Sequence, residues 1–127
     1  MVARHLERGI AAEALAARYL ERQGLHLVTS NFRAKVGELD LIMSDRQVLV
    51  IVEVRSRSRT DFVTPGATVT RGKQRRLVRT AQFFLLRYRQ FANWPVRFDV
   101  VEVTGDLAAA EIRWSRAAFT LDGMAGG

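Results

Sequence analysis

The sequence contains no cysteine among its 127 residues, which excludes disulfide bonds, thiolate metal sites and a cysteine nucleophile. Its two histidines are too few for a histidine-rich zinc site. No stretch approaches the roughly 20 consecutive apolar residues of a membrane span, and the first residues contain no apolar segment typical of a signal peptide. These absences predict a cytoplasmic protein that does not insert into a membrane.

Acidic residues are also absent between Phe62 and Phe98, although many of the chain's 20 lysines and arginines fall there. The chain has 13 acids in all and a formal net charge of +7. A positive charge of this size favours polyanions as partners, and nucleic acid is the usual polyanion. The acids gather instead in the opening segment and around two apolar runs. A basic segment beside an acidic cluster is typical of an enzyme that binds phosphates and carries out metal-dependent chemistry next to them.

Apolar periodicity and turn residues predict one domain over residues 1–121, followed by a glycine-rich tail at 122–127. Helices are expected at 3–23 and 71–90, and strands at 25–33, 37–42, 48–55, 96–103 and 111–115. The last of these strands is expected at an edge of the sheet. Gly24 follows the first helix as a natural C-cap. The elements therefore follow in the order α-β-β-β-α-β-β.

Two neighbouring strands each carry acids where an apolar residue would pack better. Side chains alternate between the two faces of a sheet, so Glu38 and Asp40 share one face of the first strand. Glu53 and Arg55 likewise share one face of the second strand. A two-residue hairpin loop at 45–46 would place Glu38 opposite Glu53 and bring all four side chains to one face. Because like charges opposite one another lower stability, a divalent cation is the candidate that offsets the repulsion.

The first helix has an apolar stripe formed by Leu6, Ile10, Ala17 and Leu20, and Glu13 lies inside it. A carboxylate on a face that packs against a core must be paired, protonated or bound to a metal. The alternative is a side chain at the edge of the stripe, which reaches water or pairs with an arginine.

Asp40 and Glu53 from neighbouring strands, together with Glu13 from the helix, would supply three hard oxygen ligands and no soft ones. Such ligands select Mg²⁺ or Mn²⁺ over zinc or copper. A metal held in this way activates a water molecule and shields charge on a phosphoryl centre. Arg55 can touch the attacking water or the scissile phosphate. Asp99, in the strand at 96–103, is interpreted as an ordinary exposed residue rather than an outer partner of the site.

The second helix carries positive charge without negative partners. Arg71, Arg75 and Arg79 are spaced at i, i+4 and i+8, so they line one face. Lys73 and Arg76 lie alongside them. Charge runs on helices are usually solvated faces, but this one has a single sign and no acid for i,i+4 pairing. The pattern favours a face that contacts phosphates.

Three features of the sequence resemble the YraN family: Glu13 in an opening helix, the segment Gly37–Ile42, and the segment Val52–Arg57. These are small bacterial proteins assigned to the PD-(D/E)XK nuclease superfamily and similar in motif to archaeal Holliday-junction resolvases. The resemblance runs from about residue 12 to about residue 103. It implies a three-layer α/β, restriction-endonuclease-like domain, in which a mixed central sheet has helices on both faces.

By this resemblance Glu13, Asp40 and Glu53 would be the metal-site carboxylates, and Arg55 would occupy the motif's lysine position. The family pattern prefers lysine there. Arginine stays charged and cannot act as a base, although it can hold a phosphate in a bidentate manner. Arg55 therefore keeps an electrostatic role and loses an acid–base one.

The sequence predicts a nucleic-acid-binding protein that hydrolyses DNA phosphodiester bonds as an endonuclease dependent on Mg²⁺ or Mn²⁺. The alternatives are a non-catalytic nucleic-acid-binding module on the nuclease scaffold, and a structural protein whose acids form salt bridges with its arginines. The residues expected to contact nucleic acid are Arg57, Arg59, Arg71, Lys73, Arg75, Arg76 and Arg79. A homodimer is implied only by analogy with junction resolvases.

Overall fold

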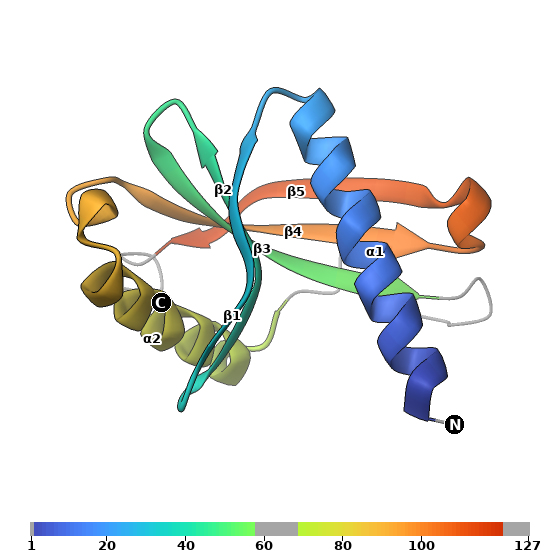
Figure 1. The fold of residues 1–127 in the computed structure, drawn as a ribbon, viewed down its shortest axis with the longest axis horizontal. Coiled ribbons are helices and arrows are strands. Elements are labelled where there is room, and N and C mark those ends of the chain that lie inside the picture. The colour runs from blue at the N-terminus through green and yellow to red at the C-terminus, as the bar shows by residue number, and fades with distance from the viewer. Residues whose placement is uncertain (1, 58–68, 121–127) are drawn as a thin grey trace.

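The computed structural model describes residues 2–57 and 69–120 of the chain (Figure 1). The helices are α1 (Val2–Arg22) and α2 (Arg71–Arg87), with short 3₁₀ turns η1 (Arg89–Phe91) and η2 (Leu107–Ala109). The strands are β1 (His26–Ala34), β2 (Gly37–Asp45), β3 (Val48–Arg57), β4 (Val96–Thr104) and β5 (Glu111–Thr120). The predicted order of elements is confirmed, and none of the described helices is both long and apolar enough to cross a membrane.

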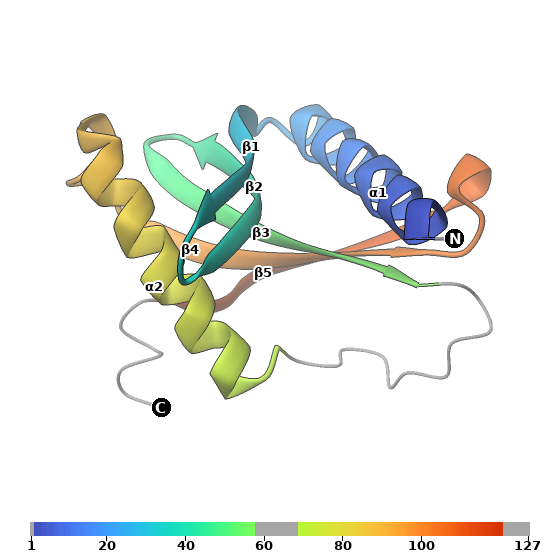
Figure 2. The same cartoon turned by 60° about the horizontal axis from the view of Figure 1, so that its bottom comes forward.

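Within the described residues, five strands form one sheet in the order β1-β2-β3-β4-β5. Neighbouring strands are antiparallel except β3 and β4, which are parallel, so the sheet is mixed. Parallel neighbours need a crossover, and α2 lies between β3 and β4 in sequence. Figures 1 and 2 show α1 on one face of the sheet and α2 on the other, which confirms the predicted three-layer α/β fold.

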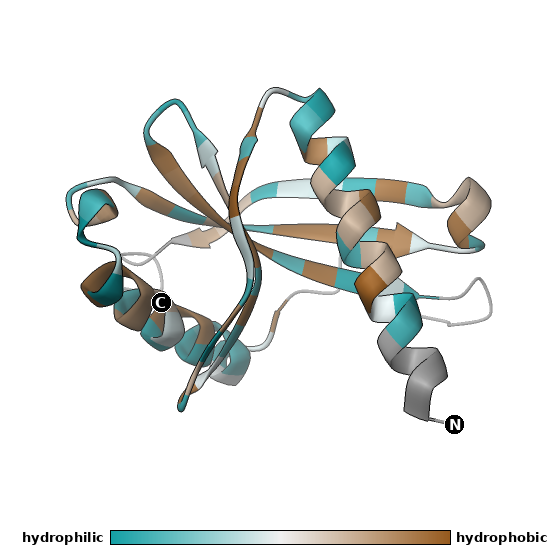
Figure 3. Ribbon diagram, viewed as in Figure 1, coloured by the Kyte–Doolittle hydropathy of each residue, from teal (hydrophilic) through white to brown (hydrophobic). Residues whose placement is uncertain are grey.

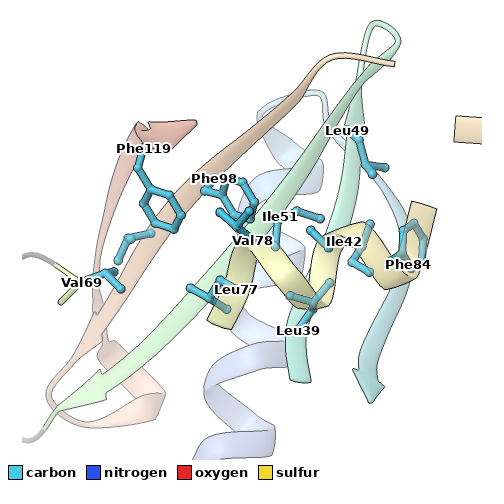
Figure 4. Packing of buried hydrophobic residues seen from close by; sticks show 12 residues of the cluster. Leu39, Ile42, Leu49, Ile51, Val69, Leu77, Val78, Phe84, Phe98 and Phe119 are labelled. Atoms are coloured by element: carbon cyan, nitrogen blue, oxygen red, sulfur yellow. The ribbon is translucent and has the colours of Figure 1, made fainter. Parts of the chain in front are cut away.

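Each helix buries its own side of the sheet. The core under α2 contains Leu39, Ile42, Leu49, Ile51, Val69, Leu77, Val78, Ala81, Phe84, Phe98, Val100 and Phe119 (Figure 4). The core under α1 contains Ala12, Ala16, Ala17, Leu20, Leu25, Leu41, Met43, Val50, Val52, Val101 and Val103. Figure 3 shows hydrophobic residues along β4 and in the middle of α1, where the helix crosses the sheet. The central strands are therefore covered on both faces, as parallel pairing requires.

The buried face of α1 differs from the predicted stripe. Ile10 is 64% exposed, whereas Ala12 and Ala16 are fully buried together with Leu20. Small alanine side chains let a helix approach a sheet closely, so the alanine face packs and the larger isoleucine points outward. Ala17 and Leu20 of the predicted stripe are buried, so the prediction is wrong at Ile10 and missed Ala12 and Ala16.

The β2–β3 hairpin turns one residue later than predicted. Its loop is Arg46-Gln47, with φ of 50° and 66°, and Asp45 pairs with Val48. Two positive φ angles are the backbone of a type I′ turn, whose twist matches that of the flanking strands. The pairing therefore shifts by two residues, so the predicted opposition of Glu38 and Glu53 is wrong. A two-residue shift by itself moves no side chain to the other face of the sheet. Leu39 nevertheless departs from the predicted alternation, since it packs with Ile42 in the core under α2 while Leu41 packs under α1.

Asp99 is buried, at 1% exposure, and its interpretation as an exposed residue is wrong. Its carboxylate accepts hydrogen bonds from Arg97 Nε at 3.1 Å, from Trp114 Nε1 at 2.9 Å and from the backbone N–H of Ala117 at 2.9 Å. Arg97 also donates to Asp45, at 3.2 Å. A buried carboxylate is tolerated when it is paired in this way.

The remaining boundaries agree with the sequence to within a few residues. Gly24 follows α1 with a positive φ of 100°, as a C-cap requires. α2 ends at Arg87 rather than at residue 90. β5 is an edge strand as predicted, and it is longer than 111–115. The predicted tail at 122–127 lies outside the described residues.

Candidate functional site

Asp40 lies where the pairing of β2 with β3 ends. The paired residues run from Asp45–Val48 back to Leu41–Val52, and Asp40 is the next residue of β2 beyond this last pair. The carboxylate of Asp40 then accepts a hydrogen bond from the backbone N–H of Val54, at 2.9 Å. Through this hydrogen bond Asp40 continues the contact between the two strands, and its carboxylate lies against that of Glu53.

The negative charge of Glu53 destabilises the charged form of Asp40. Burial, followed by the negative charge of Glu53, raises the pKa of Asp40 to about 7, and the Val54 N–H opposes the rise. A side-chain hydrogen bond to Glu53 and the charge of Glu13 raise this pKa further. Glu53 itself is only 7% exposed, in the middle strand of the sheet. At neutral pH such a pair favours any cation that reaches it.

Glu13 lies on the half-buried part of α1 and interacts electrostatically with the same acids. Burial raises its pKa, a hydrogen bond to the Asn31 side chain opposes the rise, and the charges of Glu38 and Glu53 add to it. Nevertheless, no group of three or more His, Cys, Asp or Glu side chains is placed to hold a metal ion in residues 2–57 and 69–120. The structure therefore brings Asp40 and Glu53 together and leaves Glu13 outside this pair.

A pocket of about 320 Å³ opens beside the carboxylate pair, between β2, β3 and α2. Its walls are Gly37, Glu38, Asp40, Glu53, Val54, Lys73, Arg76, Leu77 and Thr80. The start of β2 approaches α2 so closely that a Cβ on Gly37 would lie 3.0 Å from Thr80 Oγ1. A side chain at position 37 would require Thr80 to shift by a few tenths of an ångström and would be strained at the φ of 158°, so glycine favours this close approach of β2 to α2.

Lys73 enters this pocket from α2 and forms an ion pair with Glu53, through Nζ and Oε2. The start of α2 positions it, because the Thr70 hydroxyl accepts a hydrogen bond from the Lys73 backbone N–H at 3.2 Å. The sequence placed Lys73 only among the phosphate contacts. The signal that could have found it is helical spacing, since Lys73 precedes the buried residues Leu77 and Ala81 by one and two turns.

A family model described as "Uncharacterised protein family UPF0102" matches residues 12–103. The chain belongs to this family. It is the family that the sequence resembles under the name YraN, so the resemblance is confirmed.

Relatives cover nearly the whole chain. A UPF0102 protein of Coxiella burnetii (strain RSA 493 / Nine Mile phase I) is 47% identical over 114 residues, which are 90% of this chain and 92% of the relative. A UPF0102 protein of Saccharophagus degradans is 46% identical over 121 residues, 95% of this chain and 99% of the relative. One of Nitrosococcus oceani is 42% identical over 120 residues, 94% and 97% of the two chains. Their names state no activity, so function must be argued from the pocket.

In this UPF0102 protein the predicted cation at position 55 does not line the pocket. Arg55 is half-buried, two residues beyond Glu53 on β3, and it pairs in register with Glu102 of β4. Among the described residues, the cations that line the pocket are Lys73 and Arg76, both from α2. Position 55 therefore lies outside the pocket lining, and the lysine that lines the pocket is Lys73 of α2.

The other predicted phosphate contacts fall in three places. Arg71, Arg75, Arg76 and Arg79 are exposed on α2, so the basic stripe leads from the surface to the pocket. At the end of β3, the backbone oxygen of Arg57 accepts hydrogen bonds from Arg8 Nη2 at 2.9 Å and from the Gly105 N–H at 2.8 Å. Arg59 lies outside the described residues.

Proposed function

We propose that this UPF0102 protein binds nucleic acid and hydrolyses its phosphodiester bonds with a divalent cation, Mg²⁺ or Mn²⁺, held by Asp40 and Glu53. The observation that carries the proposal is the pairing of the buried Glu53 with the half-buried Asp40 in a pocket whose opposite wall is a basic helix. Acids are rarely buried side by side for stability alone, since each disfavours the charge of the other. Such pairs are common at functional sites.

The residues fit the proposed cation. Both ligands are hard oxygens, and Mg²⁺ in proteins is usually held by one or two carboxylates plus substrate phosphate and water. Two protein carboxylates are therefore sufficient. Glu13 of α1, which interacts electrostatically with Glu53, would order a water molecule instead of acting as a third ligand. When bound, the cation would supply a nucleophilic water and neutralise charge on the phosphoryl group.

The chain's own arginine and lysine side chains would bind and orient the nucleic acid. Arg71, Arg75 and Arg79 would attract the phosphate backbone over long range. Arg76 and Lys73 would contact phosphate at the pocket itself. None of these arginines can take up a proton from water, so they bind and orient the substrate and do not act as bases.

The test is cleavage by the purified chain of duplex, single-stranded and branched DNA and of RNA, with Mn²⁺ or with a chelator. Calorimetry measures Mn²⁺ binding by the same samples. We expect cleavage and binding to disappear in an Asp40→Asn/Glu53→Gln double variant and to persist in Glu21→Gln, an exposed acid of α1. Cleavage that survives the double variant, or that ignores the chelator, would overturn the proposal.

A non-catalytic nucleic-acid-binding module is the second candidate. It is favoured by the arginine at position 55 and by the finding that no three His, Cys, Asp or Glu side chains of the described residues are placed together to hold a metal ion. The same assays separate the two functions. Salt-dependent binding of nucleic acid without Mn²⁺-dependent cleavage of any substrate would support the second candidate.

A further inference from the structure

We propose that Lys73 is an internal counter-ion of Glu53 that occupies the position of the divalent cation in the metal-free protein. A metal ion must displace the Lys73 ammonium group in order to bind. The inference rests on the proposed function, because it concerns the regulation of the same carboxylate pair. It goes further by giving Lys73 two positions, one for the metal-free protein and one for the protein with cation and substrate.

The first step is the contact between Lys73 and Glu53. Lys73 Nζ pairs with one oxygen of Glu53, whose side chain is only 8% exposed. A buried carboxylate without a cation would be costly, so the ammonium group is what makes this acid tolerable in the metal-free fold. A divalent cation bound to the same carboxylate would repel the ammonium group at close range. The two cations therefore compete.

The second step is that Lys73, and not Glu53, is able to leave. Glu53 belongs to the middle strand of the sheet. The Lys73 side chain is 43% exposed and has a flexible four-carbon stem. The Thr70 cap holds its backbone in the first turn of α2, so the released ammonium group stays at the wall of the pocket. It moves by side-chain rotation, while the helix stays in place.

The third step concerns where the released charge points. Arg76 lines the same pocket one turn further along α2. A substrate phosphate at the pocket would meet both side chains, so Lys73 would provide there the lysine that position 55 lacks. Nucleic acid would stabilise the released position of Lys73, and it would thereby raise the affinity for the metal. By linkage, the metal would raise the affinity for nucleic acid by the same factor.

The experiment compares Mn²⁺ binding by calorimetry in the wild-type chain, Lys73→Met, Lys73→Gln and Arg75→Met. Arg75→Met is the matched control, since it removes the same charge from an exposed position of the same helix. We expect both Lys73 variants to bind Mn²⁺ at least about tenfold more tightly than wild type, and Arg75→Met to change affinity less than about twofold. Thermal melts establish that each variant is folded, and Mn²⁺ should raise the melting temperature most in the Lys73 variants.

The outcomes separate this inference from the proposed function. Equal Mn²⁺ affinity in wild type and both Lys73 variants would overturn the competition and leave the metal site standing. Tighter binding in Arg75→Met than in either Lys73 variant would also overturn it, because general charge would then be the cause. If no protein in the set binds Mn²⁺, the proposed metal-dependent function fails and takes the inference with it.

Discussion

Asp40 is subject to opposing forces within one side chain. The N–H of Val54 stabilises its charged form, while burial and the charge of Glu53 stabilise its neutral form and prevail. An apolar residue at this point of β2 would avoid the conflict, and the pairing of β2 with β3 would not need a carboxylate to continue it. A position that lowers stability in this way is typical of a functional site.

This conflict makes the stability of the metal-free protein depend on pH. Asp40 has a pKa of about 7 in the fold, against an ordinary value of 3.8, so the folded chain holds this proton more tightly than the unfolded chain. The free energy of unfolding should therefore fall as the pH rises from about 4 to about 7, and should change little above that range on this account. Asp40→Asn should remove this fall and raise the melting temperature at pH 8, with little effect at pH 4.

Thermal melts of the two chains in chelator, across this pH range, measure the effect. Glu21→Gln serves as the control, because Glu21 is exposed and its replacement should shift the melting temperature little at any pH. An equal gain for Asp40→Asn at pH 4 and pH 8 would mean that charge at Asp40 is not the cause.

At the scale of elements, a buried acid joins β4 to β5. The register between these strands slips between Phe98 and Val100, where β5 bulges and Ala117 takes a positive φ of 49°. Asp99 lies at this slip and accepts hydrogen bonds from Trp114 and from the Ala117 backbone. The ladder between β4 and β5 is therefore interrupted at this slip, and the Asp99 carboxylate bridges the interruption.

Asp99→Ala should consequently be severe. It would leave the Arg97 guanidinium, the Trp114 indole N–H and the Ala117 N–H without their buried acceptor, at a loss of about 3–5 kcal/mol of unfolding free energy. Urea denaturation followed by circular dichroism measures this loss. Glu111→Ala, an exposed change on β5, should stay within about 0.5 kcal/mol of wild type. A loss below about 1 kcal/mol for Asp99→Ala would show that the bulge does not depend on the carboxylate.

The same elements show what local sequence could predict. Helices and strands were found to within a few residues, because period 3.6 and period 2 are local signals. The shared face of Asp40 and Glu53 followed from alternation alone, and it survived the error in the hairpin register. The register itself failed, since neither Arg46 nor Gln47 carries the Asn-Gly or Asp-Gly signal of a type I′ turn.

Long-range contacts were the part that could not be predicted. The burial of Asp99 depends on Trp114, 15 residues later, and the pairing of Lys73 with Glu53 depends on how α2 lies across the sheet. No periodicity within a segment encodes such a placement. For the same reason the sequence could not show how Glu13, whose pKa is raised in part by the charge of Glu53, lies relative to the carboxylate pair.

At the scale of the whole molecule, the basic residues are unevenly distributed relative to the acids. Within the described residues Arg33, Lys73 and Arg97 form salt bridges to acids, whereas α2 contains no acid at all. Its exposed arginines therefore create a basic surface over one face of the sheet, next to the pocket. α1, on the other face, mixes both signs of charge. A polyanion should approach the molecule from the α2 side.

This asymmetry predicts how nucleic-acid binding depends on salt. The triple variant Arg71→Gln/Arg75→Gln/Arg79→Gln should bind DNA more weakly and reduce the steepness of log K against log salt by about 2 to 3, since each duplex phosphate contact contributes about 0.9.

The matched control is Arg18→Gln/Arg22→Gln/Arg113→Gln, which removes three exposed charges from α1 and β5. Its slope should stay within about 0.5 of the wild-type slope. Fluorescence anisotropy with a short labelled duplex, between about 50 and 200 mM salt, measures all three slopes. Equal loss of slope in both triple variants would mean that net charge, and not the α2 surface, attracts the nucleic acid.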